Sequence, residues 1–249
     1  MHKIFGIKHI ILFSISFVLI ALLFIMARKL KFATVTKIML YVGIVSETIK
    51  IFYYIIQNEE KYGGVLPKTD LPFHLCSIQI IFILILNLSK NEKLKRFLVS
   101  FMMPSCLFGG IAAILIATNS SLNGMWIISL QYFAYHVAIT VYSLYLATSK
   151  EYAPTLQDYF NCLKFLLGMM FVAIYINSIV YDGVSNINFM YVAGPPQDGL
   201  PFLNDEKGWL SYILRYAFVI IVAVTLFYIK PIVLKLKEKF KPNNDKTEE

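Results

Sequence analysis

Long apolar runs, separated by short polar segments, constrain this chain more than any other feature of its sequence. Each run holds about 20 residues, which as a helix is enough to cross a hydrocarbon core roughly 30 Å thick. The runs are continuously apolar and lack the alternation that a membrane barrel needs, so helices are expected rather than strands. The sequence therefore predicts an all-α, polytopic membrane helix bundle with about seven transmembrane helices, at roughly 9–27, 36–57, 71–89, 97–118, 126–148, 161–181 and 210–230.

The composition excludes ordinary soluble classes. Hydrophobic residues make up 58% of the 249 positions and charged residues 15%, against roughly 25% charged residues in globular chains. The net charge of +8 does not indicate a nucleic-acid partner, because the basic residues lie beside the apolar runs, where topology signals belong. The three cysteines are widely spaced, so neither a CxxC site nor a disulfide framework is expected, and no metal or cofactor is predicted.

The distribution of Lys and Arg predicts how the chain is oriented. With seven spans, alternate loops fall on opposite sides, and sixteen basic residues collect on one side. The other side holds five, namely Lys3, Lys8, Lys61, Lys68 and Lys207. By the positive-inside rule, the N-terminus is expected outside and the C-terminus in the cytoplasm. The cell membrane expected to hold the protein is a bacterial plasma membrane.

Two segments outside the spans are expected to have roles of their own. Residues 1–230 are predicted to form one transmembrane domain, followed by a basic cytoplasmic tail at 231–249. Aliphatic residues interrupt the tail, so we expect a short helix against anionic lipids and then a partly disordered end. The longest outer loop, at about 182–209, is rich in Gly and Pro and is long enough to act as a lid or re-entrant segment.

Polar side chains gather in the outer half of the spans. Glu47 and Lys50 share one helix face, either as an ion pair that locks the helix or as part of a site. The third span opens with LPFHLCSIQ, which brings His74, Cys76 and Gln79 together. A lone membrane cysteine is usually an apolar filler. As a nucleophile, Cys76 would need a base from another helix, because His74 points to a different face.

The fifth span supplies a candidate base. In QYFAYHVAITVYS, the residues Tyr132, His136, Thr140 and Ser143 recur at helical spacing and form a polar stripe. The simplest interpretation of His136 is a buried histidine that is only hydrogen-bonded, and the alternative is a partner for Cys76. Polar groups from several helices at one depth predict an enclosed outer pocket. Its other candidate members are Gln131, Tyr175, Asn177, Asn186, Asn188 and Arg215.

Three segments carry a resemblance. LPFHLCSIQ, LQYFAYHVAITVYSLYL and YINSIVYDGVSNINFMYVAGPP resemble, in the expected order, the signature segments of the YwaF-like integral membrane proteins. The likeness spans about residues 40–230. That family is similar to a eukaryotic branch containing a phospholipid acyltransferase with a cysteine nucleophile and a histidine on another helix. The resemblance implies that Cys76 is the nucleophile and His136 its general base.

The leading hypothesis is acyl transfer between a membrane phospholipid and a lysophospholipid through a thioester on Cys76. Residue type and depth suggest oxyanion or supporting roles for His74, Gln79, Gln131 and Tyr132. They suggest substrate-binding roles for Glu47, Lys50, Tyr175, Asn177, Asn186, Asn188 and Arg215. One alternative is a small-molecule permease or ligand-binding membrane module that uses the Glu47–Lys50 pair and Arg215. The other alternative is a lipid hydrolase that uses the same Cys76 and His136 with water as the acceptor.

Overall fold

The computed structural model describes residues 5–57, 64–117, 121–122, 124–195, 202–204 and 206–239. Over these ranges the chain forms eight α-helices, two short 3-10 turns and no β-strand. The helices are α1 (Ile7–Ala27), α2 (Phe32–Gln57), α4 (Leu75–Leu88), α5 (Glu92–Leu115), α7 (Trp126–Thr148), α8 (Leu156–Val180), α9 (Trp209–Phe227) and α10 (Ile229–Lys239). The turns are η1 (Lys68–Asp70) and η2 (Phe189–Tyr191). The predicted all-helical membrane bundle is confirmed.

Six of these helices are long and apolar enough to cross a membrane, namely α1, α2, α5, α7, α8 and α9. The shorter α4 has 14 residues, about 21 Å at 1.5 Å per residue, against a core of roughly 30 Å. The predicted start of this span at residue 71 is too early, because the helix begins at Leu75. Phe73 and His74 lie before it and pack their rings against Phe189, which keeps this stretch out of the helix.

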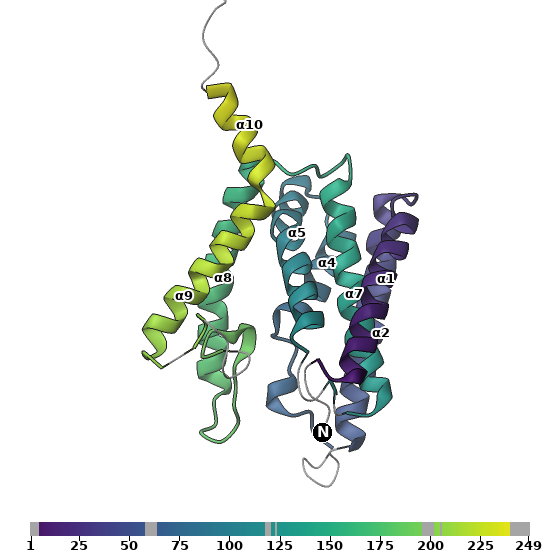
Figure 1. The fold of residues 1–249 in the computed structure, drawn as a ribbon, viewed down its shortest axis with the longest axis vertical. Helices are drawn as coiled ribbons and strands as arrows, with labels where there is room; N and C mark the ends of the chain where they lie inside the picture. The colour runs from purple at the N-terminus through teal and green to yellow at the C-terminus, as the bar shows by residue number, and fades with distance from the viewer. Residues whose placement is uncertain are drawn as a thin grey trace, which may run out of the picture.

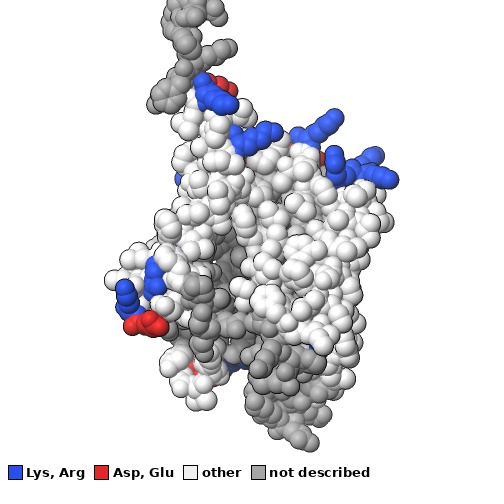
Figure 2. Space-filling view, in the orientation of Figure 1, with Lys and Arg blue, Asp and Glu red and all other residues white. Residues whose placement is uncertain are grey.

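The helices α1, α2, α4, α5 and α7 form one group, and α8 and α9 stand together beside it (Figure 1). Within the group, α7 packs against α1, α2 and, most extensively, α5, and α5 in turn contacts α8. We call the end of the bundle that carries α10 the basic end, because Lys and Arg side chains gather there (Figure 2). The opposite end, with the α8–α9 loop and the start of α1, is the loop end. The charge pattern predicts that the basic end is cytoplasmic.

Helix caps fix the basic end. The Asn91 side chain begins α5 by accepting from the backbone N–H groups of Lys93 and Leu94, at 3.0 and 3.2 Å. The first helix turn leaves such N–H groups without partners, so the cap satisfies them. Thr155 and Asp158 form a capping box at the start of α8. Asp158, 1% exposed, also pairs with Arg96 of α5 at 2.6 Å, which ties the two helix starts together.

A proline inside α5 creates a second link between helices. Pro104 has no N–H, so the carbonyl of Ser100, four residues earlier, lacks its helical donor. The hydroxyl of Tyr228, fully buried at the end of α9, donates to this carbonyl at 2.7 Å. One turn along, the Ser143 hydroxyl of α7 donates to the carbonyl of Met103. The carbonyl freed by Pro104 is therefore satisfied by Tyr228, and Ser143 adds a separate bond from α7 to α5.

Candidate functional site

The thiol of Cys76 lies in the first turn of α4, at the loop end of the bundle. His74 is the N-cap residue, and the first backbone bond of the helix runs from the Ile78 N–H to the His74 carbonyl at 3.0 Å. The N–H groups of the first turn are thus not used inside the helix. The thiol at this turn is half-buried. Such a position can hold an oxyanion.

The predicted pair of Glu47 and Lys50 is an ion pair in the structure, with 2.7 Å between the amine and a carboxylate oxygen. Both side chains are mostly buried, at 18% and 17% exposure. The Ser77 hydroxyl joins the pair to α4, donating to Glu47 at 3.3 Å and accepting from Lys50 at 3.4 Å. Because Ser77 follows Cys76, these bonds place the ion pair next to the helix turn that carries the thiol.

Asp70 in η1 adds a third ionisable group to this region. Burial raises the pKa of its carboxyl, and the positive charge of Lys50 opposes that rise. The Thr69 hydroxyl donates to the carboxylate at 3.2 Å. The turn before α4 therefore brings another acid toward the Glu47–Lys50 pair, which the spacing of the sequence did not predict.

His136 lies on the face of α7 that packs against α5. Its Nδ1 lies 2.7 Å from the carbonyl of Tyr132, and its ring lies 4.3 Å from the Tyr132 ring. A carbonyl only accepts, so Nδ1 carries the proton and Nε2 is the basic nitrogen of the neutral ring. The predicted polar stripe is real, and much of it serves helix packing. Ser143, for example, donates to the Met103 carbonyl of α5.

The structure brings α7 to Cys76 through the residue before His136. The Tyr135 hydroxyl donates to the backbone carbonyl of Cys76 at 2.7 Å. Within the described parts of the chain, no hydrogen bond joins His136 to Cys76. A catalytic pair would have to tighten when a substrate binds, as such pairs often do. Tyr135 was not singled out from the sequence, although a tyrosine in an apolar run beside His136 is a usable signal.

The predicted supporting residues make contacts between helices. Gln79 is 1% exposed, and its amide nitrogen donates to Ser105 at 3.0 Å, whereas its amide oxygen is buried without a partner. The Gln131 amide donates to Ser46 at 2.6 Å, and the Tyr132 hydroxyl donates to the Ala113 carbonyl at 3.1 Å. These contacts position α7 against α2 and α5, and a role in stabilising an oxyanion stays a prediction.

The loop between α8 and α9 folds back onto the start of α4. The Asn177 side chain holds Phe189 through two bonds, to its carbonyl at 3.1 Å and from its N–H at 2.8 Å. Asn188 closes the next turn on Ala193 and Gly194. The ring of His74 packs against those of Phe189 and Tyr191, 5.2 and 5.8 Å between centroids. The sequence predicted a lid or re-entrant segment here, and residues 196–201 and 205 of the loop lie outside the described residues.

The other predicted substrate-binding residues lie apart from Cys76. Arg215 donates to the carbonyls of Phe202 and Asn204, at 2.7 and 2.6 Å, so its guanidinium holds the α8–α9 loop. Tyr175 is 70% exposed on α8, and Asn186 is exposed in the loop. The structure does not gather these three side chains with the Glu47–Lys50 pair, and substrate contacts by them remain predictions.

An apolar cavity of about 280 Å³ lies next to the start of α4. Side chains of α5, α8 and α9 line most of it, and in Figure 2 the surface is hollowed between α9 and the other helices. Leu75, the neighbour of Cys76, forms part of the wall, together with Met190 and Val192 of the folded-back loop. The loop and the residue that precedes Cys76 therefore border a space suited to an aliphatic chain.

Residues 4–228 match the model of the TMEM164 family. The chain belongs to the TMEM164 family. The match runs through α9 to Tyr228 and includes Cys76, His136 and the α8–α9 loop. No curated protein and no solved structure matches the chain. Membership of TMEM164 agrees with the several membrane-spanning helices, and the likeness to YwaF-like proteins remains a prediction from the sequence motifs.

Proposed function

We propose that this chain is a membrane-embedded lipid acyltransferase that moves a fatty acyl chain from a phospholipid to a lysophospholipid through a thioester on Cys76. The observation that carries the proposal is the position of Cys76. Its thiol lies in the N-terminal turn of α4, and the preceding residue, Leu75, lines the apolar cavity. A nucleophile, unused N–H groups and space for a chain are the parts that acyl transfer needs.

The first half of the reaction forms the thioester. A thiol is mostly protonated at neutral pH, so His136 Nε2 takes its proton as substrate binding brings the two together. The sulfur then bonds to the ester carbonyl carbon, and the N–H groups of the α4 turn hold the oxyanion. The carbon–oxygen bond breaks, and the departing lysophospholipid oxygen receives the proton from His136.

The second half regenerates the thiol. The hydroxyl of an acceptor lysophospholipid gives its proton to His136 Nε2, and its oxygen attacks the thioester carbonyl carbon. The carbon–sulfur bond breaks, and the proton returns to the Cys76 sulfur. In both halves the Lys50 amine, held by Glu47 and Ser77, offers a positive charge near the phosphate of the lipid.

The basic end supports a second contact with lipid. Helix α10 continues from α9 and exposes Val233, Leu234 and Leu236 together with lysines. Apolar and basic residues on one short helix favour binding along an anionic membrane surface. Within the proposal, anionic lipids of the cytoplasmic leaflet are the partner of this helix.

Mass spectrometry tests the proposal. Purified full-length protein is mixed with phospholipid and lysophospholipid of different chain lengths, and both lipids and intact protein are weighed. We expect new diacyl species and an acyl adduct on the protein, both lost in Cys76→Ala and both kept in Cys162→Ala, which removes a buried thiol of α8. Free fatty acid alone would favour a hydrolase. A permease would leave every lipid unchanged and show Lys50-dependent uptake of a small solute.

A further inference from the structure

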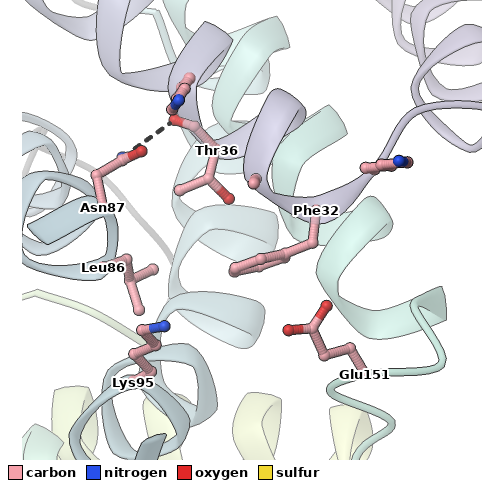
Figure 3. Close-up of a pocket in the computed structure, with 9 residues that line it drawn as sticks. Phe32, Thr36, Leu86, Asn87, Lys95 and Glu151 are labelled. Atoms are coloured by element: carbon pink, nitrogen blue, oxygen red, sulfur yellow. Dashed lines mark hydrogen bonds between the residues drawn. The ribbon is translucent and has the colours of Figure 1, made fainter. Parts of the chain in front are cut away.

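A pocket of about 580 Å³ opens at the basic end of the bundle, between α2, the end of α4, the start of α5 and the α7–α8 connection. Figure 3 shows its walls, with Lys95 and Leu86 on one side of the space and Glu151 and Phe32 on the other. The pocket is far from the candidate acyl-transfer site. Cys76 begins α4 whereas Leu86 and Asn87 lie near its end, so about 15 Å of helix separates them.

The pocket carries more positive than negative charge. Three lysines line it, Lys31, Lys37 and Lys95, against one acid, Glu151. Lys95 is 19% exposed and pairs with Glu92, 2.8 Å away, which is itself 69% exposed. In the described part of the chain, Lys31 and Lys37 form no salt bridge with a carboxylate. Two amines are therefore available to a bound anion.

The base of the pocket is held in place without any ligand. The Asn87 amide nitrogen donates to the carbonyls of Ile83 and Thr36, at 2.8 and 3.4 Å, which joins α4 to α2 (Figure 3). The Thr36 hydroxyl lies 3.1 Å from the hydroxyl of Tyr142 on α7. Because three helices fix these groups, the pocket is formed before any anion arrives, and binding does not need to order it.

The mixed lining indicates which anion fits. Phe32 and Leu86 supply apolar surface next to the amines, at the level where the apolar helices end. Phospholipid headgroups lie at this level of a membrane, and basic pockets between transmembrane helices on the cytoplasmic side bind anionic headgroups. A soluble phosphate ester has the same charged group but no glycerol or chain to cover the apolar part.

We propose that this pocket binds the phosphate of an anionic phospholipid headgroup. Lys31 and Lys37 are the main contacts, and the negative charge of Glu151 weakens the binding. The bound lipid is separate from any acyl-transfer substrate, so this inference holds whatever reaction Cys76 performs.

Lipid binding to the full-length protein in detergent tests the site. Native mass spectrometry measures affinity for phosphatidylglycerol, with phosphatidylcholine as the neutral reference and glycerol 3-phosphate as the soluble source of the same chemistry. Lys31→Gln with Lys37→Gln is compared with Lys29→Gln plus Lys93→Gln, two exposed lysines of the same end outside the pocket lining. Each lost lysine should cost about fivefold in affinity. The Lys31→Gln/Lys37→Gln variant (the pocket pair) should therefore bind phosphatidylglycerol about 25-fold more weakly at low salt, whereas the Lys29→Gln/Lys93→Gln variant (the control pair) should change little.

Glu151→Gln has the opposite expected sign. Removing the only acid among the described lining residues should strengthen phosphatidylglycerol binding several-fold, which a general loss of folding cannot imitate. Binding of glycerol 3-phosphate with the same dependence on Lys31 and Lys37 would support the phosphate site and assign it a soluble ligand. Equal losses in the pocket and control pairs, or no loss in either, would overturn the proposal.

Discussion

The Tyr135 hydroxyl of α7 donates to the Cys76 carbonyl of α4 at 2.7 Å, and this bond is a direct side-chain link from α7 to the turn that carries the thiol. Tyr135 is 4% exposed, so if its hydroxyl were removed, water could not easily take its place as the donor to the Cys76 carbonyl. The orientation of the Cys76 turn relative to His136 therefore depends on the residue next to that histidine.

Replacing Tyr135 by Phe should lower the free energy of unfolding by about 1 kcal/mol and reduce acyl transfer more than that loss explains. The matched control is Tyr145→Phe, which removes a similar bond from a buried tyrosine to the Leu30 carbonyl at the basic end. Thermal unfolding and lipid turnover are measured for both. Equal activity losses in the two variants would make Tyr135 a purely structural residue.

The Glu47–Lys50 pair allows its structural and functional roles to be separated. Lys50→Met alone leaves a mostly buried carboxylate without its partner and should destabilise the protein by about 3 kcal/mol or more. Adding Glu47→Gln removes that charge and should restore most of the stability. If Lys50 contacts the lipid phosphate, the double variant stays inactive although it is stable, whereas recovery of transfer in the double variant would leave the pair a structural role only.

Asn177 should control the folded-back loop. Asn177→Ala removes both bonds to Phe189, and we expect faster hydrogen exchange across residues 187–194 and a stability loss of about 1–3 kcal/mol. The exposed Asn186 provides a control, because Asn186→Ala changes the same residue type nearby without a buried bond. Unchanged exchange in Asn177→Ala would show that the loop is held mainly by its aromatic contacts.

The Asp182 turn predicts an acid dependence. The N–H groups of Ser185 and Val184, the Ser185 hydroxyl and Lys68 hold the pKa of the Asp182 carboxyl well below its usual range. For a lowered pKa, the stabilisation is complete above the unfolded-state value of about 3.9 and is lost as the pH falls toward the folded-state value. The difference in thermal midpoint between wild type and Asp182→Asn should stay constant from about pH 5 to 8 and shrink below about pH 4. A change near neutral pH would assign the dependence to another group.

Gly110 lies at a close approach of α5 and α7. A Cβ at this position would overlap the Thr140 hydroxyl oxygen and press on the His136 carbonyl. Gly110→Ala should therefore cost about 1–3 kcal/mol and impair transfer, despite the better helix propensity of alanine. Gly168→Ala in α8 is the control, because no atom lies near its Cβ, and we expect it to be neutral or slightly stabilising. Thermal unfolding checks this, because only Gly110→Ala should lower the midpoint.

Most of the helices could be predicted because each is a continuous apolar run, and that property belongs to the local sequence. The start of α4 could not be predicted, since Leu71, Pro72 and Phe73 extend the apolar run to earlier residues. In the structure His74 has an extended backbone as the N-cap residue, and the rings of Phe73 and His74 pack against Phe189, more than a hundred residues away.

The candidate site, too, could be predicted where local sequence determines it and not where packing between helices does. The spacing of Glu47 and Lys50 was enough to predict their pairing, because residues three apart share a helix face. The bridging role of Ser77 and the contact of Tyr135 with Cys76 depend on how each helix is rotated against its neighbours, which one sequence does not specify. Asn177 and Asn188 were predicted to hold a headgroup, and their side chains hold the backbone of the loop.

The bond from Tyr228 to the Ser100 carbonyl has a practical consequence for shortening the protein. Tyr228 lies after the last residue of α9, and residues 4–228 are also the extent of the family match. A chain cut after Phe227 would keep every membrane span but would lose the donor that satisfies the carbonyl freed by Pro104. A chain cut after Tyr228 would lose only α10 and the residues C-terminal to it. A shortened chain should therefore keep Tyr228.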